Sequence, residues 1–239
     1  AMSGVTNELI KKSLDISNNF SSSEHDVLVS SGEQVACSLI AGRLIHKGFK
    51  SRSWLSWQIP ILTKGAHKNS RINQINKNKI IKYLKEGGVP IITGFQGVND
   101  FNRVTTLGRG GSDASAIMIA KFFKAKRCII YTDVEGVYTT DPKTIKKAKK
   151  IEKISYEEML EMASMGSKVM QPASIQDARL NRINIDVKSS FKNKSGTLIT
   201  KRKNIPNNRI ITGISYTKND SKITLLGVVD KPGVAASIF

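Results

Sequence analysis

The sequence predicts an α/β fold, a three-layer sandwich in which a mainly parallel central sheet lies between helices. Apolar residues recur with helical spacing in segments that alternate with short apolar runs of strand length. A glycine-rich segment at 107–111 joins one such run to a helical pattern. The 239 residues, 39% of them hydrophobic, are enough to bury a large core. Folds of this class bind ligands at the carboxyl ends of their strands.

Capping residues predict the helices at the start of the chain. Ser3 can cap a first helix, in which apolar residues recur every three or four positions. Ser31 and Gln34 form a capping-box pattern ahead of further apolar residues, so a second helix is expected to begin there. Gly48 is expected to end this second helix.

The middle of the chain is predicted to alternate between helix and strand. Glycines mark the helix ends, and the strands are short runs rich in β-branched residues. The expected elements are a helix from about Ser70 to 87–88, a strand at 89–93, a helix from Ser112, a strand at 128–134 and a helix that a capping box opens at Ser155.

The segment 107–113, Leu-Gly-Arg-Gly-Gly-Ser-Asp, has the composition of an anion-binding loop. Gly108, Gly110 and Gly111 let backbone N–H groups approach a phosphate or carboxylate closely, and the following helix adds its partial positive charge. Arg109 adds a guanidinium that can form two parallel hydrogen bonds to an anion. The alternative is a plain connection between a strand and a helix, because the loop lacks the G-x-x-x-x-G-K-[ST] pattern.

A second segment, 129–142, has the composition of a nucleotide-binding region. It combines an apolar strand with a polar turn, and it contains two aspartates, two tyrosines and a glycine. Such a turn suits a nucleotide at the carboxyl end of a parallel strand. The alternative is a buried strand that is followed by an ordinary Gly/Asp turn.

Together these two segments resemble the amino acid kinase family, and further segments narrow the resemblance to its aspartate kinase branch. They occur in the expected order at 3–9, 31–33, 94–97, 108–113, 132–142 and 166–168. The resemblance implies transfer of the γ-phosphoryl group of ATP to the β-carboxylate of L-aspartate, which gives 4-phospho-L-aspartate. This is the first step of lysine, threonine and methionine biosynthesis. The alternatives are another amino acid kinase or a non-catalytic fragment that senses an effector.

The resemblance implies a substrate site around the glycine loop. Arg109 would clamp the α-carboxylate of aspartate, and Glu33 would bind its ammonium group. Thr6 and Phe95 would shape the pocket, although the Phe95 ring has an alternative role in ordinary loop packing.

The same resemblance implies a set of residues at the transferring phosphoryl group. Gly110, Gly111 and Ser112 would face it, and Asp113 would orient cationic groups in the active site. Lys168 would be a cation near the phosphates. The alternative for Lys168 is a solvated helix face, since lysine is abundant in this chain.

The nucleotide side is implied by resemblance as well. Six residues are expected to line the path of the adenosine and phosphates: Thr132, Asp133, Tyr138, Thr140, Pro142 and Lys143. Most family members have Arg where this chain has Lys143, so the charge is kept but the planar fork is lost. Mg²⁺ is expected with ATP, coordinated mostly by phosphates and water, and no protein metal ligand is expected.

Two domains are expected by resemblance. Residues 1–203 correspond to the catalytic domain without its first strand and its Lys-Gly-Gly loop, which puts the activity of this exact chain in question. Residues 209–239 correspond to the start of an ACT regulatory domain, and two strands are expected there, at 210–216 and 222–229. The full-length protein is expected to form a homo-oligomer through the ACT region.

The charge of the chain is strongly positive, with 38 Lys and Arg against 19 Asp and Glu and a net charge of +19. Such a charge can indicate nucleic-acid binding. The lysines are dispersed among Asn and Ile, however, and no nucleic-acid-binding motif accompanies them, so nucleic acid is not the expected partner. The start of the sequence lacks the pattern of a signal peptide and its apolar runs are too short for a membrane span, so neither is expected. A cytoplasmic enzyme that acts on small molecules is therefore expected.

Overall fold

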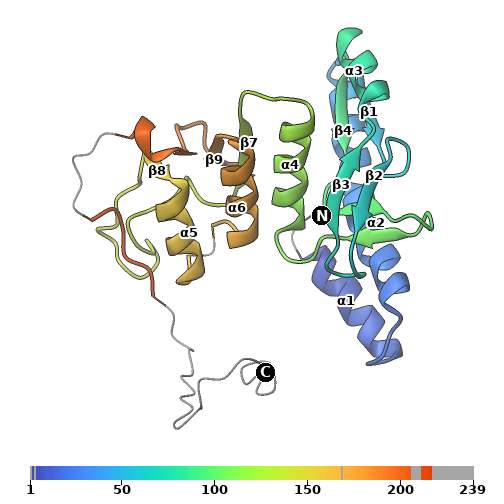
Figure 1. Cartoon of the computed structure of the whole chain (residues 1–239), viewed down its shortest axis with the longest axis horizontal. Coiled ribbons are helices and arrows are strands. Elements are labelled where there is room, and N and C mark those ends of the chain that lie inside the picture. The colour runs from blue at the N-terminus through green and yellow to red at the C-terminus, as the bar shows by residue number, and fades with distance from the viewer. Residues whose placement is uncertain (1, 3, 168, 206–210, 217–239) are drawn as a thin grey trace, which may run out of the picture.

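The computed structural model describes residues 2, 4–167, 169–205 and 211–216 (Figure 1). The helices in these residues are α1 (Val5–Ile16), α2 (Ser22–His46), α3 (Asn78–Lys85), α4 (Gly111–Phe122), α5 (Tyr156–Ser164), α6 (Pro172–Asn181) and the short 3₁₀ helix η1 (Arg202–Asn204). The strands are β1 (Ser51–Trp54), β2 (Ile61–Lys64), β3 (Arg71–Ile75), β4 (Val89–Ile92), β5 (Gln96–Val98), β6 (Val104–Thr106), β7 (Cys128–Thr132), β8 (Lys153–Ser155), β9 (Ile185–Ser189) and β10 (Thr197–Thr200).

The strands of the described residues form three sheets. One sheet pairs β1 with β4, the second has the order β3-β2-β5-β6, and the third has the order β7-β9-β10-β8. Four of the seven strand pairings are parallel, among them β1 with β4 and β7 with β9. The predicted α/β class is confirmed, and the predicted strands at 89–93 and 128–134 are present as β4 and β7.

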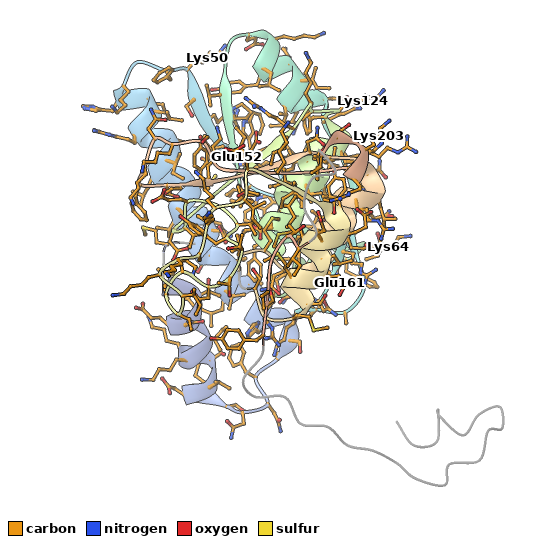
Figure 2. All side chains as sticks on the ribbon, turned by 90° about the vertical axis from the view of Figure 1, so that its left-hand side faces the viewer. Lys50, Lys64, Lys124, Glu152, Glu161 and Lys203 are labelled. Atoms are coloured by element: carbon orange, nitrogen blue, oxygen red, sulfur yellow. The ribbon has the colours of Figure 1, made fainter. Side chains whose placement is uncertain are left out.

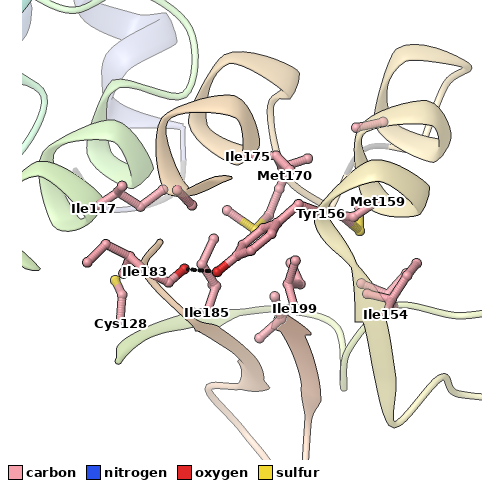
Figure 3. Close-up of a cluster of buried hydrophobic side chains, with 14 of the residues drawn as sticks. Ile117, Cys128, Ile154, Tyr156, Met159, Met170, Ile175, Ile183, Ile185 and Ile199 are labelled. Atoms are coloured by element: carbon pink, nitrogen blue, oxygen red, sulfur yellow. Dashed lines mark hydrogen bonds between the residues drawn. The ribbon is translucent and has the colours of Figure 1, made fainter. Parts of the chain in front are cut away.

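The first half of the molecule contains α1–α3 and β1–β6, and the second half contains α5, α6 and β7–β10. Helix α4 lies between the two halves and contributes to the core of each (Figure 1). Ile117 is fully buried in the core of the second half, together with Tyr156 and Ile185 (Figure 3). Met118 and Phe122 instead pack against the core of the first half. A helix with apolar residues around its circumference is suited to such a buried position.

Helix α5 begins at the predicted capping box. The Ser155 Oγ accepts a hydrogen bond from the Glu158 N–H at 3.1 Å, and the Glu158 Oε2 accepts one from the Ser155 N–H at 2.9 Å. Two N–H groups that the helix itself cannot satisfy are thereby paired. The prediction is confirmed.

We expect Ser155→Ala to lower the free energy of unfolding by about 1 kcal/mol, because the cap loses its acceptor. Urea denaturation monitored by circular dichroism measures this change. Ser164→Ala, at the exposed end of the same helix, serves as the matched control and should leave stability almost unchanged. Equal losses in the two variants would show that the cap contributes nothing specific.

The second helix begins earlier than predicted. α2 starts at Ser22, and Ser31 lies inside it, where its Oγ donates to the carbonyl of Leu28 at 2.7 Å. A serine inside a helix commonly forms this bond to the preceding turn, so the predicted cap at Ser31 is wrong. The predicted end is close to the observed one, since Gly48 follows α2 with φ 85°.

The third helix begins later than predicted, at Asn78 instead of about Ser70, because the intervening segment forms β3. Ile72 and Ile75 are both buried, and their three-residue spacing imitates a helical period. The register between β2 and β3 shifts at Asn73, which has no partner across the pair. This β-bulge brings both isoleucines to the same face of a strand.

The end of the described chain differs from the prediction. Residues 211–216 have no regular secondary structure, so the strand predicted at 210–216 is wrong for this part. Residues 211–216 instead pack against the second half of the molecule. The Ile214 N–H donates to the Thr139 carbonyl at 2.7 Å, and the Thr212 Oγ1 donates to the Glu158 Oε1 at 2.6 Å. The strand predicted at 222–229 lies outside the described residues.

Basic side chains are spread over the surface. The lysines labelled in Figure 2, Lys50, Lys64, Lys124 and Lys203, are exposed and lie on different parts of the molecule. None of the helices within the described ranges is both long enough and apolar enough to cross a bilayer.

Candidate active site

The glycine loop, residues 107–111, connects β6 to α4. Gly108 and Gly110 have φ 73° and 72°, in the left-handed region that favours glycine. Space is also limited, because a Cβ added to Gly108 would lie 2.9 Å from the Lys68 carbonyl oxygen. One added to Gly111 would lie 2.6 Å from the Phe95 ring. Backbone conformation or close packing therefore requires glycine at each of these positions.

Two helices begin beside the glycine loop. Gly110 is the N-cap of α4 and packs against Gln171, the N-cap of α6, and the Ser174 Oγ donates to the Gly110 carbonyl at 3.3 Å. Because helix N-termini carry unpaired N–H groups and partial positive charge, both can attract an anion. Gln171 and Ser174 are not among the site residues predicted from the sequence. Pro172, at the first position of α6, is the signal that could have revealed this helix.

Glu33 reaches the start of α4 from α2. Its Oε1 accepts a hydrogen bond from the Ser112 Oγ at 3.1 Å. Glu33 is half-buried, whereas Ser112 and Arg109 are exposed. The structure thus brings a carboxylate and a hydroxyl together at the helix N-terminus that follows Arg109 in the chain.

Phe95 lies in the turn between β4 and β5 and ties that turn to the glycine loop. Its φ of 66° is unusual for a residue other than glycine. Its N–H donates to the Ser115 Oγ at 2.8 Å, and its carbonyl accepts from the Leu107 N–H at 3.0 Å. The ring packs against Gly111, so the structure contains the packing role that was the alternative for this ring.

Asp113 occupies the first turn of α4 and is half-buried. Burial raises the pKa of its carboxyl group above the ordinary value. Its side chain forms no hydrogen bond or ion pair with any residue that the structure describes. Burial and then the charge of Asp113 raise the pKa of the Cys128 thiol to about 11. A buried carboxylate of this kind would be stabilised by a cation at its side.

Thr6 is a predicted site residue that no contact between described residues joins to this cluster. Thr6 lies half-buried in the first turn of α1 and takes part in none of the side-chain hydrogen bonds between described residues. Gly4 occupies the N-cap position of α1 with φ 85°, while Ser3, the predicted cap, is outside the described residues. Lys168 is outside them as well.

The predicted nucleotide residues begin with Thr132, the last residue of β7, and continue into the segment that follows the strand. The Thr132 Oγ1 donates to the Asp133 Oδ1 at 3.1 Å, and Tyr138 is held by an antiparallel bridge to Lys150. The backbone N–H of Lys143 donates to a carboxylate two residues before it at 2.8 Å. Side chains are half-buried at Thr132, Tyr138 and Thr140 and exposed at Asp133, Pro142 and Lys143. The segment is therefore a folded turn with accessible groups.

The residues of this site fit a phosphorylated ligand. The close-packed glycines and the N-termini of α4 and α6 lie together, and such groups can attract an anion. Across the described ranges, no group of three or more His, Cys, Asp or Glu side chains is placed to hold a metal ion. Mg²⁺ that accompanies a nucleotide takes most of its ligands from phosphates and water, so ATP with Mg²⁺ is compatible with this arrangement.

Comparison with known proteins identifies relatives over the whole chain. Residues 1–189 match the family model described as the amino acid kinase family. The chain is 46% identical over 240 residues to a protein from Pseudomonas putida named aspartate kinase, covering 100% of this chain and 58% of the relative. It is 47% identical over 232 residues to a Rickettsia felis protein named aspartokinase, covering 95% of this chain and 58% of the relative. The chain thus spans less than two thirds of these relatives.

Solved structures show the same similarity. The structure described as E. coli aspartokinase III in complex with aspartate and ADP matches with a TM-score of 0.73 and 31% identity, over 85% of this chain and 48% of that one. The structure described as aspartate kinase from Synechocystis matches with a TM-score of 0.73 and 37% identity, over 84% of this chain and 33% of that one.

Proposed function

Because this chain belongs to the amino acid kinase family, we propose that it is the catalytic part of an aspartate kinase. The proposed reaction transfers the γ-phosphoryl group of ATP to the β-carboxylate of L-aspartate, giving 4-phospho-L-aspartate and ADP. The observation that carries the proposal is the Glu33–Ser112 hydrogen bond at the start of α4, directly after Arg109 and the glycine loop. The names of the relatives support the choice of aspartate within the family.

Aspartate is recognised in this proposal through its α-carbon groups. Arg109 binds the α-carboxylate with two parallel hydrogen bonds, and Glu33 accepts a hydrogen bond from the ammonium group. Thr6 and Phe95 shape the pocket around the side chain of the substrate. These contacts leave the β-carboxylate free to approach the nucleotide.

The transfer step relies on alignment and charge neutralisation. An oxygen of the β-carboxylate attacks the γ-phosphorus, and the bond from that phosphorus to the β–γ bridging oxygen breaks, so that ADP takes the electron pair. A carboxylate is already deprotonated and needs no general base. Ser112 and the backbone N–H groups of Gly110 and Gly111 face the transferring group. In the structure the Ser112 hydroxyl donates to Glu33 and the Gly111 N–H donates to the Gly108 carbonyl at 3.1 Å, so both bonds must be exchanged for bonds to the phosphoryl oxygens. Lys168 supplies positive charge, and Asp113 orients the cationic groups.

The nucleotide is held by the segment after β7 in this proposal. Thr132, Asp133, Tyr138, Thr140 and Pro142 line the adenosine and phosphate path. Lys143 completes the set. It supplies a single positive charge where most family members have the planar guanidinium group of an arginine. Mg²⁺, when bound, neutralises charge on the phosphates.

Several properties of the full-length protein belong to the same proposal. Residues 1–203 act as the catalytic domain, and 209–239 begin an ACT regulatory domain through which the protein forms a homo-oligomer. The protein acts in the cytoplasm, at the first step of lysine, threonine and methionine biosynthesis. Its partners are the small molecules aspartate and ATP.

The full-length protein provides the direct test. Incubation with ATP, Mg²⁺, L-aspartate and hydroxylamine should give aspartyl hydroxamate, because hydroxylamine traps an acyl phosphate. Glutamate and UMP, tried in place of aspartate, probe other activities of the family through ADP release. Release of ADP with one of these two and not with aspartate would contradict the proposal.

We expect Glu33→Gln to weaken aspartate binding by roughly ten- to a hundredfold, because a charge-assisted hydrogen bond contributes about 1.5–3 kcal/mol. Succinate carries both carboxylates but no ammonium group, so its inhibition constant should change much less. The KM for aspartate and the inhibition constant for succinate are measured in the full-length enzyme. Glu157→Gln, in a surface ion pair with Arg179 at 3.1 Å, is the control. Equal changes for aspartate and succinate would show that Glu33 does not recognise the amine.

A further inference from the structure

Helix α2 presents a polar stripe to the substrate site, formed by Asp26, Ser30 and Glu33. These positions are spaced i, i+4 and i+7, so they lie on one face of the helix and span about 10.5 Å along its axis. Glu33 contacts Ser112, just after the glycine loop, as described above. The other two positions of the polar stripe contact the segments that precede and flank this loop.

Asp26 is completely buried and accepts hydrogen bonds from two segments of the chain. Its Oδ1 accepts from the Thr106 Oγ1 at 2.6 Å, and its Oδ2 accepts from the Thr106 backbone N–H at 3.1 Å. The Lys68 N–H lies within 3.0 Å of Oδ2, and the His67 Nδ1 forms a hydrogen bond with the same oxygen at 2.7 Å. A buried carboxylate with this many partners is fully satisfied.

Both groups that Asp26 holds adjoin the glycine loop. Thr106 is the residue directly before the loop, and its carbonyl accepts from the Ser70 N–H at 2.9 Å. The Lys68 carbonyl lies against Gly108, so close that no side chain fits there. Movement of either group would therefore move the backbone that carries Arg109.

Ser30 contacts the chain at the turn between β4 and β5. Its carbonyl accepts a hydrogen bond from the Gln96 Nε2 at 3.1 Å, and Gln96 is completely buried next to Phe95. One face of α2 thus fixes the residue before the glycine loop, the residue after it and the turn that packs on it.

We propose that Asp26 is a positioning residue for aspartate recognition, which acts through Thr106 and Lys68 to fix the glycine loop and hence Arg109. This inference rests on the proposed function, because the recognised group is the α-carboxylate of aspartate. The competing explanation is that Asp26 only stabilises the fold. If Asp26 positions the loop, its substitution raises the KM for aspartate. If Asp26 only stabilises the fold, its substitution lowers stability and leaves this KM unchanged.

Asp26→Asn in the full-length enzyme replaces one acceptor oxygen by a donor that faces other donors. We expect the KM for aspartate to rise about tenfold, since small misplacements of a binding group have effects of this size, and the KM for ATP to stay within about twofold. Thr106→Val, which removes the hydroxyl that donates to Asp26, should act in the same direction. Thr106→Ser keeps the hydroxyl and should behave like the parent.

Tyr156→Phe is the control for stability. It removes a buried hydrogen bond from the tyrosine hydroxyl to the Ile183 carbonyl, 2.8 Å long, in the core of the second half (Figure 3). This variant should lose thermal stability while its KM for aspartate stays within about twofold of the parent. An Asp26→Asn enzyme with lowered stability but an unchanged KM for aspartate would overturn the positioning role.

Hydrogen–deuterium exchange gives a readout that does not need activity. The backbone N–H groups of 106–111 should exchange faster in Asp26→Asn than in the parent, and at parental rates in Tyr156→Phe. If the parent forms no aspartyl hydroxamate, the proposed function fails, yet faster exchange would still support the anchoring of the loop. Unchanged exchange in Asp26→Asn would refute it.

Discussion

Arg109→Lys in the full-length enzyme is expected to raise the KM for aspartate about a hundredfold, a loss of roughly 2.7 kcal/mol. The lysine keeps the positive charge but cannot form the two parallel hydrogen bonds by which a guanidinium holds a carboxylate. The KM for ATP should stay within about twofold, because Arg109 is assigned to aspartate alone. Steady-state kinetics with both substrates varied measures the two constants.

Arg127→Lys is the matched control for this prediction. Arg127 is an exposed arginine whose Nη1 lies 3.2 Å from the Asp186 Oδ2, in a surface ion pair of the second half. Surface pairs of this kind contribute little, so both KM values should remain close to those of the parent. An Arg109→Lys enzyme in which the two KM values rise equally would argue against an aspartate clamp.

Asp113→Asn is expected to lower kcat by at least about a hundredfold and, at the same time, to stabilise the fold. Activity falls because a neutral amide cannot orient cationic groups around the transferring phosphoryl group. Stability rises because burial raises the pKa of Asp113, which means that the folded state disfavours the ionised carboxylate present at neutral pH. Turnover and urea denaturation of the same preparation test both parts.

The pH dependence of this stability difference has a defined sign. A group with a raised pKa in the folded state contributes stability that is fully present below its unfolded pKa and is lost as the pH rises through its folded pKa. The advantage of Asp113→Asn over the parent should therefore grow as the pH rises through the pKa of Asp113 and then stay constant. An advantage that shrinks with rising pH would contradict the assignment.

Asp177→Asn separates the two effects of the Asp113 substitution. Asp177 lies in α6, and burial raises its pKa as well, against smaller opposing contributions from Arg71 and Lys121. Its substitution should stabilise the protein without a comparable loss of turnover. If both variants lost activity equally, the loss in Asp113→Asn could not be assigned to the site.

The parts of the fold and of the site that depend on local chemistry could be predicted from the sequence. The glycines at 108 and 110 need left-handed φ values, and a loop of this kind followed by apolar residues leads into α4. The capping box at Ser155 involves residues only three positions apart. In each case the interacting groups are neighbours in the chain, so the pattern itself carries the information.

The parts that depend on contacts between distant segments could not be predicted. The polar stripe of α2 was missed because Asp26 meets its partners only in the folded chain, 80 residues further on at Thr106. The β-bulge at Asn73 gave β3 a helix-like spacing of apolar residues, and only the pairing with β2 resolves it. The convergence of α6 on the glycine loop is likewise a property of the tertiary structure.

The position of α4 couples the melting of the two halves. Ile117 belongs to one hydrophobic core and Met118 packs against the other, so both cores lose packing contacts when this helix unfolds. Heating should therefore give a single cooperative transition over the described parts of the chain, and limited proteolysis should not release either half as a stable fragment. The helix that starts at the glycine loop is therefore also the element through which the stability of each half depends on the other.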